Sequence, residues 1–242
     1  MNLPNAITAA RIAVAPVIAW MIVLPSWPVR LAAWVLYVAA AVTDYYDGKL
    51  ARSRNLVTDL GRLLDPLADK LLLVCTLGPM WWLTRGLPLV SPTPVGDDWA
   101  VSGVVGPVMS GVHEAWPLVT PIGLVAFPLW IVLVVLGREA IMTVFRQYAA
   151  RRGLIISAIG PAKWKTGFQS VWAGSAFFWF FAAAAAADHR WSADWWRYFA
   201  LFNGIVGALT MIGAVALTVY SLALYGRRYG YILVSSAGEV GR

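Results

Sequence analysis

The chain has 242 residues, of which 60% are hydrophobic and 13% are charged, and its formal net charge is +7. A mean hydropathy of +0.68 excludes an ordinary soluble domain. The pI of about 9.8 needs no nucleic acid to explain it, and we expect anionic lipid headgroups and an anionic substrate as partners.

Apolar runs of about 20 residues, the length that spans a bilayer, recur along the whole chain. These runs are apolar on nearly every side, which is typical of membrane helices and not of amphipathic helices in a soluble bundle. We therefore predict an all-α integral membrane protein with one membrane-embedded domain over residues 1–242 and six transmembrane helices. The helices are predicted at 8–24, 29–51, 61–84, 117–146, 163–186 and 195–225.

The first apolar run lacks the basic n-region and the cleavage site of a signal peptide. We expect residues 1–7 to form a short interfacial segment that leads into a retained span. With six spans, both termini lie on one side of the membrane, opposite a loop at about 85–116. Of the 19 Lys and Arg residues, four fall on the side of that loop: Arg30, Arg85, Arg190 and Arg197. The positive-inside rule therefore places the termini in the cytoplasm and the 85–116 loop outside.

Four aspartates near the first predicted loop are predicted to converge. At 100° per residue, one face of the second predicted helix carries Asp44, Asp47, Gly48, Ala51 and Arg52. One face of the third predicted helix carries Gly61, Asp65, Ala68 and Asp69. The two helices run antiparallel, and at about 1.5 Å per residue their acids match in depth just below the cytoplasmic surface.

Four carboxylates this close do not all remain ionised without cations. No His or Cys lies near them in the pattern, and an all-oxygen set suits Mg²⁺ or Mn²⁺, with room for two ions. The alternative is a structural ion-pair network with Lys70 and Arg52, although these cations are fewer than the acids. The small residues Gly48, Ala51 and Gly61 leave space beside the acids for a ligand.

The spacing of these residues is Asp44-x2-Asp47-Gly48-x2-Ala51-Arg52-x8-Gly61-x3-Asp65-x3-Asp69. It resembles the signature of the CDP-alcohol phosphotransferase family. The resemblance implies a six-helix membrane enzyme, usually a homodimer, that moves a phosphatidyl group from a CDP-linked lipid to an alcohol and releases CMP. It also implies that the four aspartates bind two divalent ions and that Asp69 takes the acceptor's hydroxyl proton. Gly48, Ala51, Arg52 and Gly61 are implied to adjoin the CDP-lipid.

Further stretches resemble the bacterial phosphatidylglycerophosphate synthase branch of this family, among them "NLPNAITAARI" and "REAIMTVFRQYAARRG…AKWKTGFQ". In the first stretch, Asn5, Thr8 and Arg11 share a helical face that we expect near the nucleotide or its phosphates. In the second, the residues expected to receive an acceptor phosphate are Arg138, Arg146, Lys163 and Lys165. The branch implies CDP-diacylglycerol and sn-glycerol 3-phosphate as substrates, in the bacterial cytoplasmic (inner) membrane with the active site facing the cytoplasm.

Two kinds of alternative stay open from the sequence. A cardiolipin synthase of the same family, with phosphatidylglycerol as acceptor, shares the N-terminal pattern, and an inositol phosphate acceptor also needs basic residues. A cation transporter with a carboxylate site belongs to another class. It requires acids near the bilayer centre, whereas these acids are predicted toward one end of their helices.

Overall fold

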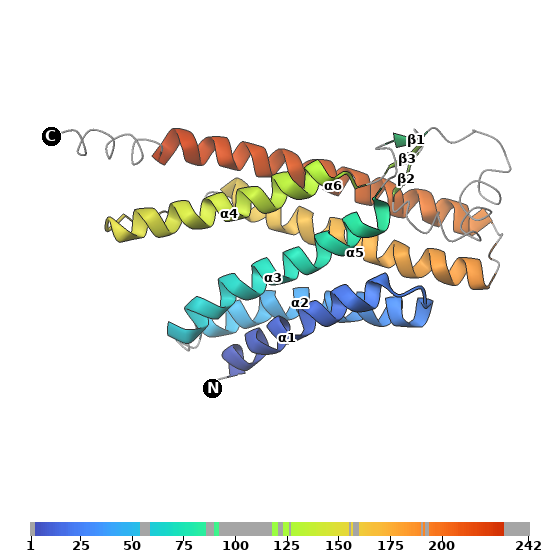
Figure 1. The fold of residues 1–242 in the computed structure, drawn as a ribbon, viewed down its shortest axis with the longest axis horizontal. Helices are drawn as coiled ribbons and strands as arrows, with labels where there is room; N and C mark the ends of the chain where they lie inside the picture. The colour runs from blue at the N-terminus through green and yellow to red at the C-terminus, as the bar shows by residue number, and fades with distance from the viewer. Residues whose placement is uncertain are drawn as a thin grey trace.

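The computed structural model describes residues 3–53, 59–85, 90–91, 118–120, 123–125, 127–154, 156, 160–189, 191 and 194–229. Within them the chain forms six α-helices: α1 (Leu3–Val23), α2 (Trp27–Ser53), α3 (Asp59–Thr84), α4 (Leu129–Arg151), α5 (Gly160–Asp188) and α6 (Asp194–Tyr229). It also forms three short strands: β1 (Val90–Ser91), β2 (Leu118–Thr120) and β3 (Gly123–Val125). The helices lie roughly along one direction and make a single bundle (Figure 1).

Helix α5 lies at the centre of the bundle. It packs against α2 and α6, while α1 packs against α2 and α3, and α4 contacts α3 and α6. Its large side chains Trp172, Phe177 and Trp179 are fully buried, and so is its alanine run at 182–186. Alanines allow close approach of neighbouring helices, so this run brings α5 tightly against its neighbours.

Polar contacts join α2 to this central helix. The Trp34 indole donates a hydrogen bond of 3.1 Å to the carbonyl of Gly174, and the Tyr37 hydroxyl donates one of 3.0 Å to the carbonyl of Ser170. Both acceptors belong to α5, so the face of α2 that leads to Asp44 is fixed relative to α5.

Several helix ends meet at one end of the bundle. The start of α1, the ends of α2, α4 and α6 and the start of α3 all lie there (Figure 1, left). Helix α4 ends with a hydrogen-bonded cap, in which Leu154 N–H donates to Ala149 and Gly153 N–H donates to Ala150, both at 3.0 Å. Gly153 has φ of +73°, which glycine adopts without strain. This is the end that the sequence predicts to face the cytoplasm.

The predicted fourth helix, 117–146, is wrong at its start. Strands β2 and β3 occupy residues 118–120 and 123–125 in an antiparallel sheet of order β1-β3-β2, and α4 begins at Leu129. Prolines at 117, 121 and 128 interrupt this apolar run and oppose a helix, whereas its Val and Thr residues favour strands. The all-α prediction holds for the six helices of the described residues, and the structure adds one small three-stranded sheet to it.

Residues 3–7 of the predicted N-terminal interfacial segment form the first turns of α1 without a break, and residues 1 and 2 lie outside the described residues. Pro4 suits this position, since the first turn has N–H groups with no helical partner. Among the described helices, three stretches are long and apolar enough to cross a bilayer: Asn5–Val23, Trp164–Asp188 and Tyr198–Tyr229. The protein is thus consistent with membrane embedding. Apart from β1, residues 86–117 lie outside the described residues.

Candidate functional site

A polar face of α1 lies beside the aspartates. Asn5, Thr8 and Arg11 follow one another at three-residue spacing in an otherwise apolar helix, and 5%, 2% and 4% of their surfaces are exposed. Helix α1 packs against α2 and α3, which carry the acids. Buried polar residues in such a helix need polar partners, and the acids provide them for Thr8 and Arg11.

Two of these residues contact three of the predicted metal-binding acids. Arg11 forms an ion pair with Asp44, and its Nη1 lies 3.5 Å from Asp69 Oδ1. Thr8 donates a hydrogen bond of 2.9 Å to Asp65 Oδ1. The structure therefore brings Asp44 of α2 together with Asp65 and Asp69 of α3 along one face of α1, as the sequence predicts for these acids.

Arg11 and its acids differ in exposure. The Arg11 side chain is 2% exposed, whereas Asp44 and Asp69 are 46% and 60% exposed, and Asp65 is exposed as well. The guanidinium is therefore covered by protein, whereas the carboxylate side chains reach the surface. Carboxylate oxygens are the type of ligand that hard divalent ions prefer.

No group of three or more His, Cys, Asp or Glu side chains among the described residues is compact enough to hold a metal ion. Asp47, the fourth predicted metal ligand, is not included in this statement because its side chain is not among those described. The side chains of five predicted site residues are not among those described: Asp47, Gly48, Ala51, Arg52 and Lys163. Gly61 is buried near the start of α3.

A cavity of about 170 Å³ adjoins these acids. Its wall comes from four helices and includes Asp44 of α2, Asp69 of α3, Glu139 of α4 and Gln169 of α5. The remaining lining residues are Tyr37, Ala41, Lys70, Leu72, Leu73, Thr76, Thr166, Ser170 and Ala173. The cavity therefore extends from the aspartates to helices α4 and α5, which carry the predicted acceptor-binding cations.

Two of those cations, Arg138 and Lys165, pair with Glu139. Lys165 of α5 forms an ion pair with Glu139, and Arg138 Nη1 lies 3.0 Å from Glu139 Oε1. Arg138 Nη2 also donates a hydrogen bond of 3.1 Å to Ser221 Oγ of α6. Arg138 and Lys165 are buried, at 5% and 3% exposed. One carboxylate thus lies between two buried cations, which leaves an excess of positive charge for an anionic ligand.

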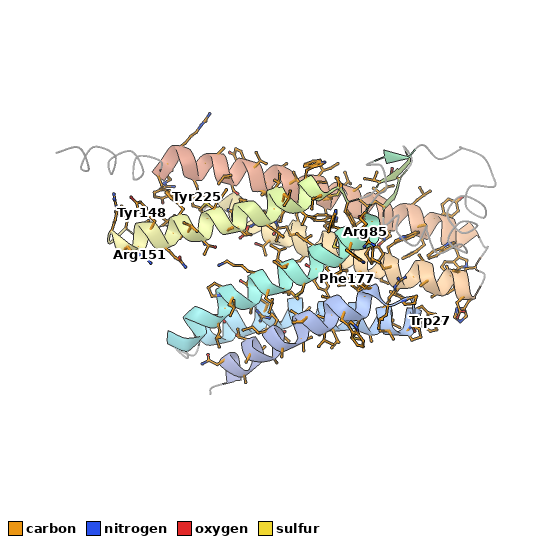
Figure 2. All side chains as sticks on the ribbon, in the orientation of Figure 1. Trp27, Arg85, Tyr148, Arg151, Phe177 and Tyr225 are labelled. Atoms are coloured by element: carbon orange, nitrogen blue, oxygen red, sulfur yellow. The ribbon has the colours of Figure 1, made fainter. Side chains whose placement is uncertain are left out.

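Arg146 joins this cluster through Tyr225. Its Nη2 donates a hydrogen bond of 3.3 Å to the Tyr225 hydroxyl, and its guanidinium lies 5.8 Å from the ring centre. Arg138 lies 5.9 Å from the same ring. Figure 2 shows Tyr225 near the end of α6, beside the part of α4 that carries Tyr148 and Arg151. Tyr225 therefore connects two of the predicted acceptor-binding arginines.

The sequence prediction missed Glu139, Gln169, Ser221 and Tyr225. A signal for Glu139 was present, because an acid inside an apolar helix indicates a functional or paired group. Gln169 follows Lys165 by four residues, which puts both on one face of a helix. Ser221 and Tyr225 had no comparable signal, since their role depends on the packing of α6 against α4.

A family model described as CDP-alcohol phosphatidyltransferase matches residues 1–220. A CDP-diacylglycerol–glycerol-3-phosphate 3-phosphatidyltransferase of Rickettsia bellii is 49% identical over 76 residues, 31% of this chain and 42% of that protein. CDP-diacylglycerol–glycerol-3-phosphate 3-phosphatidyltransferase 2 of Arabidopsis thaliana is 30% identical over 175 residues, 71% of this chain and 62% of that protein. A CMP-forming cardiolipin synthase of Streptomyces coelicolor is 42% identical over 85 residues, 34% of this chain and 40% of that protein. The chain thus spans 40% to 62% of the length of these relatives.

Proposed function

Because the chain belongs to the CDP-alcohol phosphatidyltransferase family, we propose that it transfers the phosphatidyl group of CDP-diacylglycerol to sn-glycerol 3-phosphate. The products are phosphatidylglycerophosphate and CMP, in phospholipid biosynthesis. One observation carries this proposal: Asp44 and Asp69 line the same cavity as Glu139, the partner of two buried cations. The acids on one part of the cavity wall suit divalent metal ions, and the cations next to another part suit the phosphate of an alcohol acceptor. Together they suit a metal-dependent reaction of a phosphorylated alcohol.

The four aspartates are the proposed ligands of two divalent ions, Mg²⁺ or Mn²⁺. Support comes from the contacts of Asp44, Asp65 and Asp69 with α1 and from the exposure of their side chains. Once bound, the ions neutralise the pyrophosphate and stabilise the attacking and leaving oxygens of an in-line displacement. Among the residues of this chain, Arg11 orients Asp44 and Asp69, and Thr8 orients Asp65.

In the proposed step, the primary hydroxyl oxygen of the acceptor bonds to the phosphatidyl phosphorus. The bond between that phosphorus and the oxygen of CMP breaks, and CMP leaves with the bonding electrons. Asp69 accepts the proton of the attacking hydroxyl, and its position on the cavity wall suits this role. Asn5, Thr8 and Arg11, with Gly48, Ala51, Arg52 and Gly61, form the proposed face for the CDP-lipid.

The acceptor phosphate is proposed to bind Arg138, Arg146 and Lys165, together with Lys163. The first two converge on Tyr225, and Arg138 and Lys165 share Glu139. Arginine binds phosphate through two parallel hydrogen bonds and lysine adds a point charge. Relatives named for the use of glycerol 3-phosphate favour that acceptor over phosphatidylglycerol, the acceptor of the cardiolipin synthase alternative.

We also propose that all six helices span the bacterial cytoplasmic membrane, that the active site faces the cytoplasm, and that the protein is a homodimer. The helix ends gathered near the site agree with the excess of basic residues there (Figure 1). Labelling of a cysteine at Arg151→Cys, in a Cys75→Ala background, tests the orientation. Labelling from the periplasmic side alone contradicts it. Light scattering in detergent tests the dimer.

The test of function uses the purified full chain with CDP-diacylglycerol and Mg²⁺. Glycerol 3-phosphate, phosphatidylglycerol and inositol phosphate are supplied in parallel, and both CMP and the lipid product are measured. We expect CMP release and phosphatidylglycerophosphate with glycerol 3-phosphate. Faster CMP release with phosphatidylglycerol, accompanied by cardiolipin, assigns the chain to the alternative. The Asp69→Asn variant is the matched control for CMP formed by contaminating enzymes.

A further inference from the structure

One polar side chain on the cavity wall has no role in the reaction described so far. Gln169 of α5 lines the cavity and is 6% exposed. Its amide nitrogen has no hydrogen-bond partner among the described residues. Most buried polar side-chain atoms have such a partner, because an unpaired one costs folding free energy. Gln169 combines this unpartnered nitrogen with a place on the cavity wall, and that combination makes it a candidate to bind a group that enters the cavity.

Other polar side chains on the same wall are already paired. Tyr37 donates to the carbonyl of Ser170 at 3.0 Å, and Thr76 donates to the carbonyl of Leu73 at 3.0 Å. Glu139 accepts from Arg138 and Lys165. Gln169 differs from these three residues, since its amide nitrogen has no hydrogen-bond partner among the described residues.

The position of Gln169 relates it to both charged parts of the site. Lys165 precedes it by four residues on α5, so the two side chains share a helix face. Lys165 pairs with Glu139, and Glu139, Gln169 and Asp69 all line the cavity. In the proposed function, the acceptor's phosphate lies near the cations and its reacting hydroxyl lies near Asp69. The atoms between these two groups then lie in the cavity that Gln169 lines.

This inference rests on the proposed function. Glycerol 3-phosphate carries a phosphate at one end, the reacting primary hydroxyl at the other, and a secondary hydroxyl between them. We propose that Gln169 is a specificity-determining residue whose side-chain amide hydrogen-bonds this secondary hydroxyl. An amide offers both a donor and an acceptor, so it matches a hydroxyl, which also offers both. A buried site built to bind a hydroxyl rejects the analogue that lacks it.

The probe is 3-hydroxypropyl phosphate, which keeps the phosphate and the primary hydroxyl but lacks the secondary hydroxyl. With the wild-type protein, we expect kcat/KM for glycerol 3-phosphate to exceed that for the probe by about tenfold or more. In Gln169→Leu, which preserves side-chain size, kcat/KM for glycerol 3-phosphate falls to near that of the probe. The value for the probe itself and the KM for CDP-diacylglycerol change little.

Thr166→Val is the matched control, because Thr166 lines the same cavity on the same helix. It should keep the wild-type preference between the two acceptors. Equal losses on both acceptors in Gln169→Leu, or an unchanged preference, overturn the inference and leave the proposed function intact. A wild-type preference below about threefold overturns it whether or not the variant folds. If the wild-type protein releases CMP with neither acceptor, the proposed function fails and the inference fails with it.

Discussion

Arg11 of α1 and Asp44 of α2 form an ion pair in which the arginine is buried and the aspartate is half-exposed. The same guanidinium nitrogen lies 3.5 Å from Asp69 of α3. One buried cation therefore stabilises two acids of different helices, and the side chains of both acids are partly exposed. The N-terminal helix in this way contributes a side chain to the candidate site.

The first prediction concerns this shared cation. Arg11→Gln removes the positive charge next to Asp44 and Asp69, so the two carboxylates repel each other and the melting temperature in EDTA should fall. A ligand that binds the folded state stabilises it. Mg²⁺ should therefore raise the melting temperature of Arg11→Gln more than that of the wild type. Arg11→Lys keeps the charge and is the control. An equal Mg²⁺ effect in all three proteins contradicts the prediction.

The second prediction concerns the acids themselves. Asp44→Asn, Asp47→Asn, Asp65→Asn and Asp69→Asn should each fold but lose CMP release by a factor of about a thousand, because a metal ligand or base is lost. EDTA should abolish the wild-type activity, and added Mg²⁺ or Mn²⁺ should restore it. Circular dichroism checks the fold of each variant. Full turnover in EDTA, or an unimpaired Asp47→Asn protein, excludes the two-metal site.

Much of the acidic part of the site was predictable from the sequence. The spacing of Asp44, Asp65 and Asp69 fixes them on helix faces, and their two helices are joined by a short loop, so their convergence requires little further information. The polar face of α1 was also evident as Asn5, Thr8 and Arg11. That Arg11 pairs with Asp44 depends on how α1 packs against α2 and α3, and no local pattern encodes this.

Other features depend on contacts between distant segments. An apolar run has no period that distinguishes a buried strand from a buried helix, so the start of α4 was misplaced at 117 instead of Leu129. Prolines 117, 121 and 128 oppose a helix and indicate that α4 begins after them. That the Gln169 amide nitrogen has no partner among the described residues is visible once the helices are assembled, because whether a polar group is satisfied is a property of its surroundings.

The third prediction tests the packing of α5 against α6. A Cβ added at Gly213 of α6 would lie 2.4 Å from the ring of Phe168 of α5, whereas one added at Gly226 would meet nothing within 4 Å. Gly213→Ala should therefore destabilise the fold by about 1–3 kcal/mol, the usual cost of overpacking. Gly226→Ala, on the same helix, should be neutral or slightly stabilising because alanine favours a helix. Unfolding in mixed detergent micelles measures both, and equal stability of the two variants contradicts the packing.

The last prediction separates acceptor binding from general positive charge at the membrane surface. Arg146 and Arg151 are both exposed arginines of α4, but Arg146 contacts the Tyr225 hydroxyl at 3.3 Å and so belongs to the cluster with Arg138. Arg146→Ala should raise the KM for glycerol 3-phosphate about tenfold or more, because a charged hydrogen bond to phosphate is lost. The KM for CDP-diacylglycerol should stay nearly constant.

Arg151→Ala is the matched control and should leave both KM values unchanged. Tyr225→Phe removes the hydroxyl that receives the Arg146 hydrogen bond but keeps the ring. It should raise the acceptor KM by about two- to fivefold, since it weakens the positioning of Arg146 and leaves its charge in place. Combining Tyr225→Phe with Arg146→Ala should add little to the effect of Arg146→Ala alone, because both act on one contact. If the increases in acceptor KM from the two substitutions multiply in the double variant, Tyr225 does not act through Arg146. If Arg146→Ala leaves the acceptor KM unaltered, Arg146 does not belong to the acceptor site.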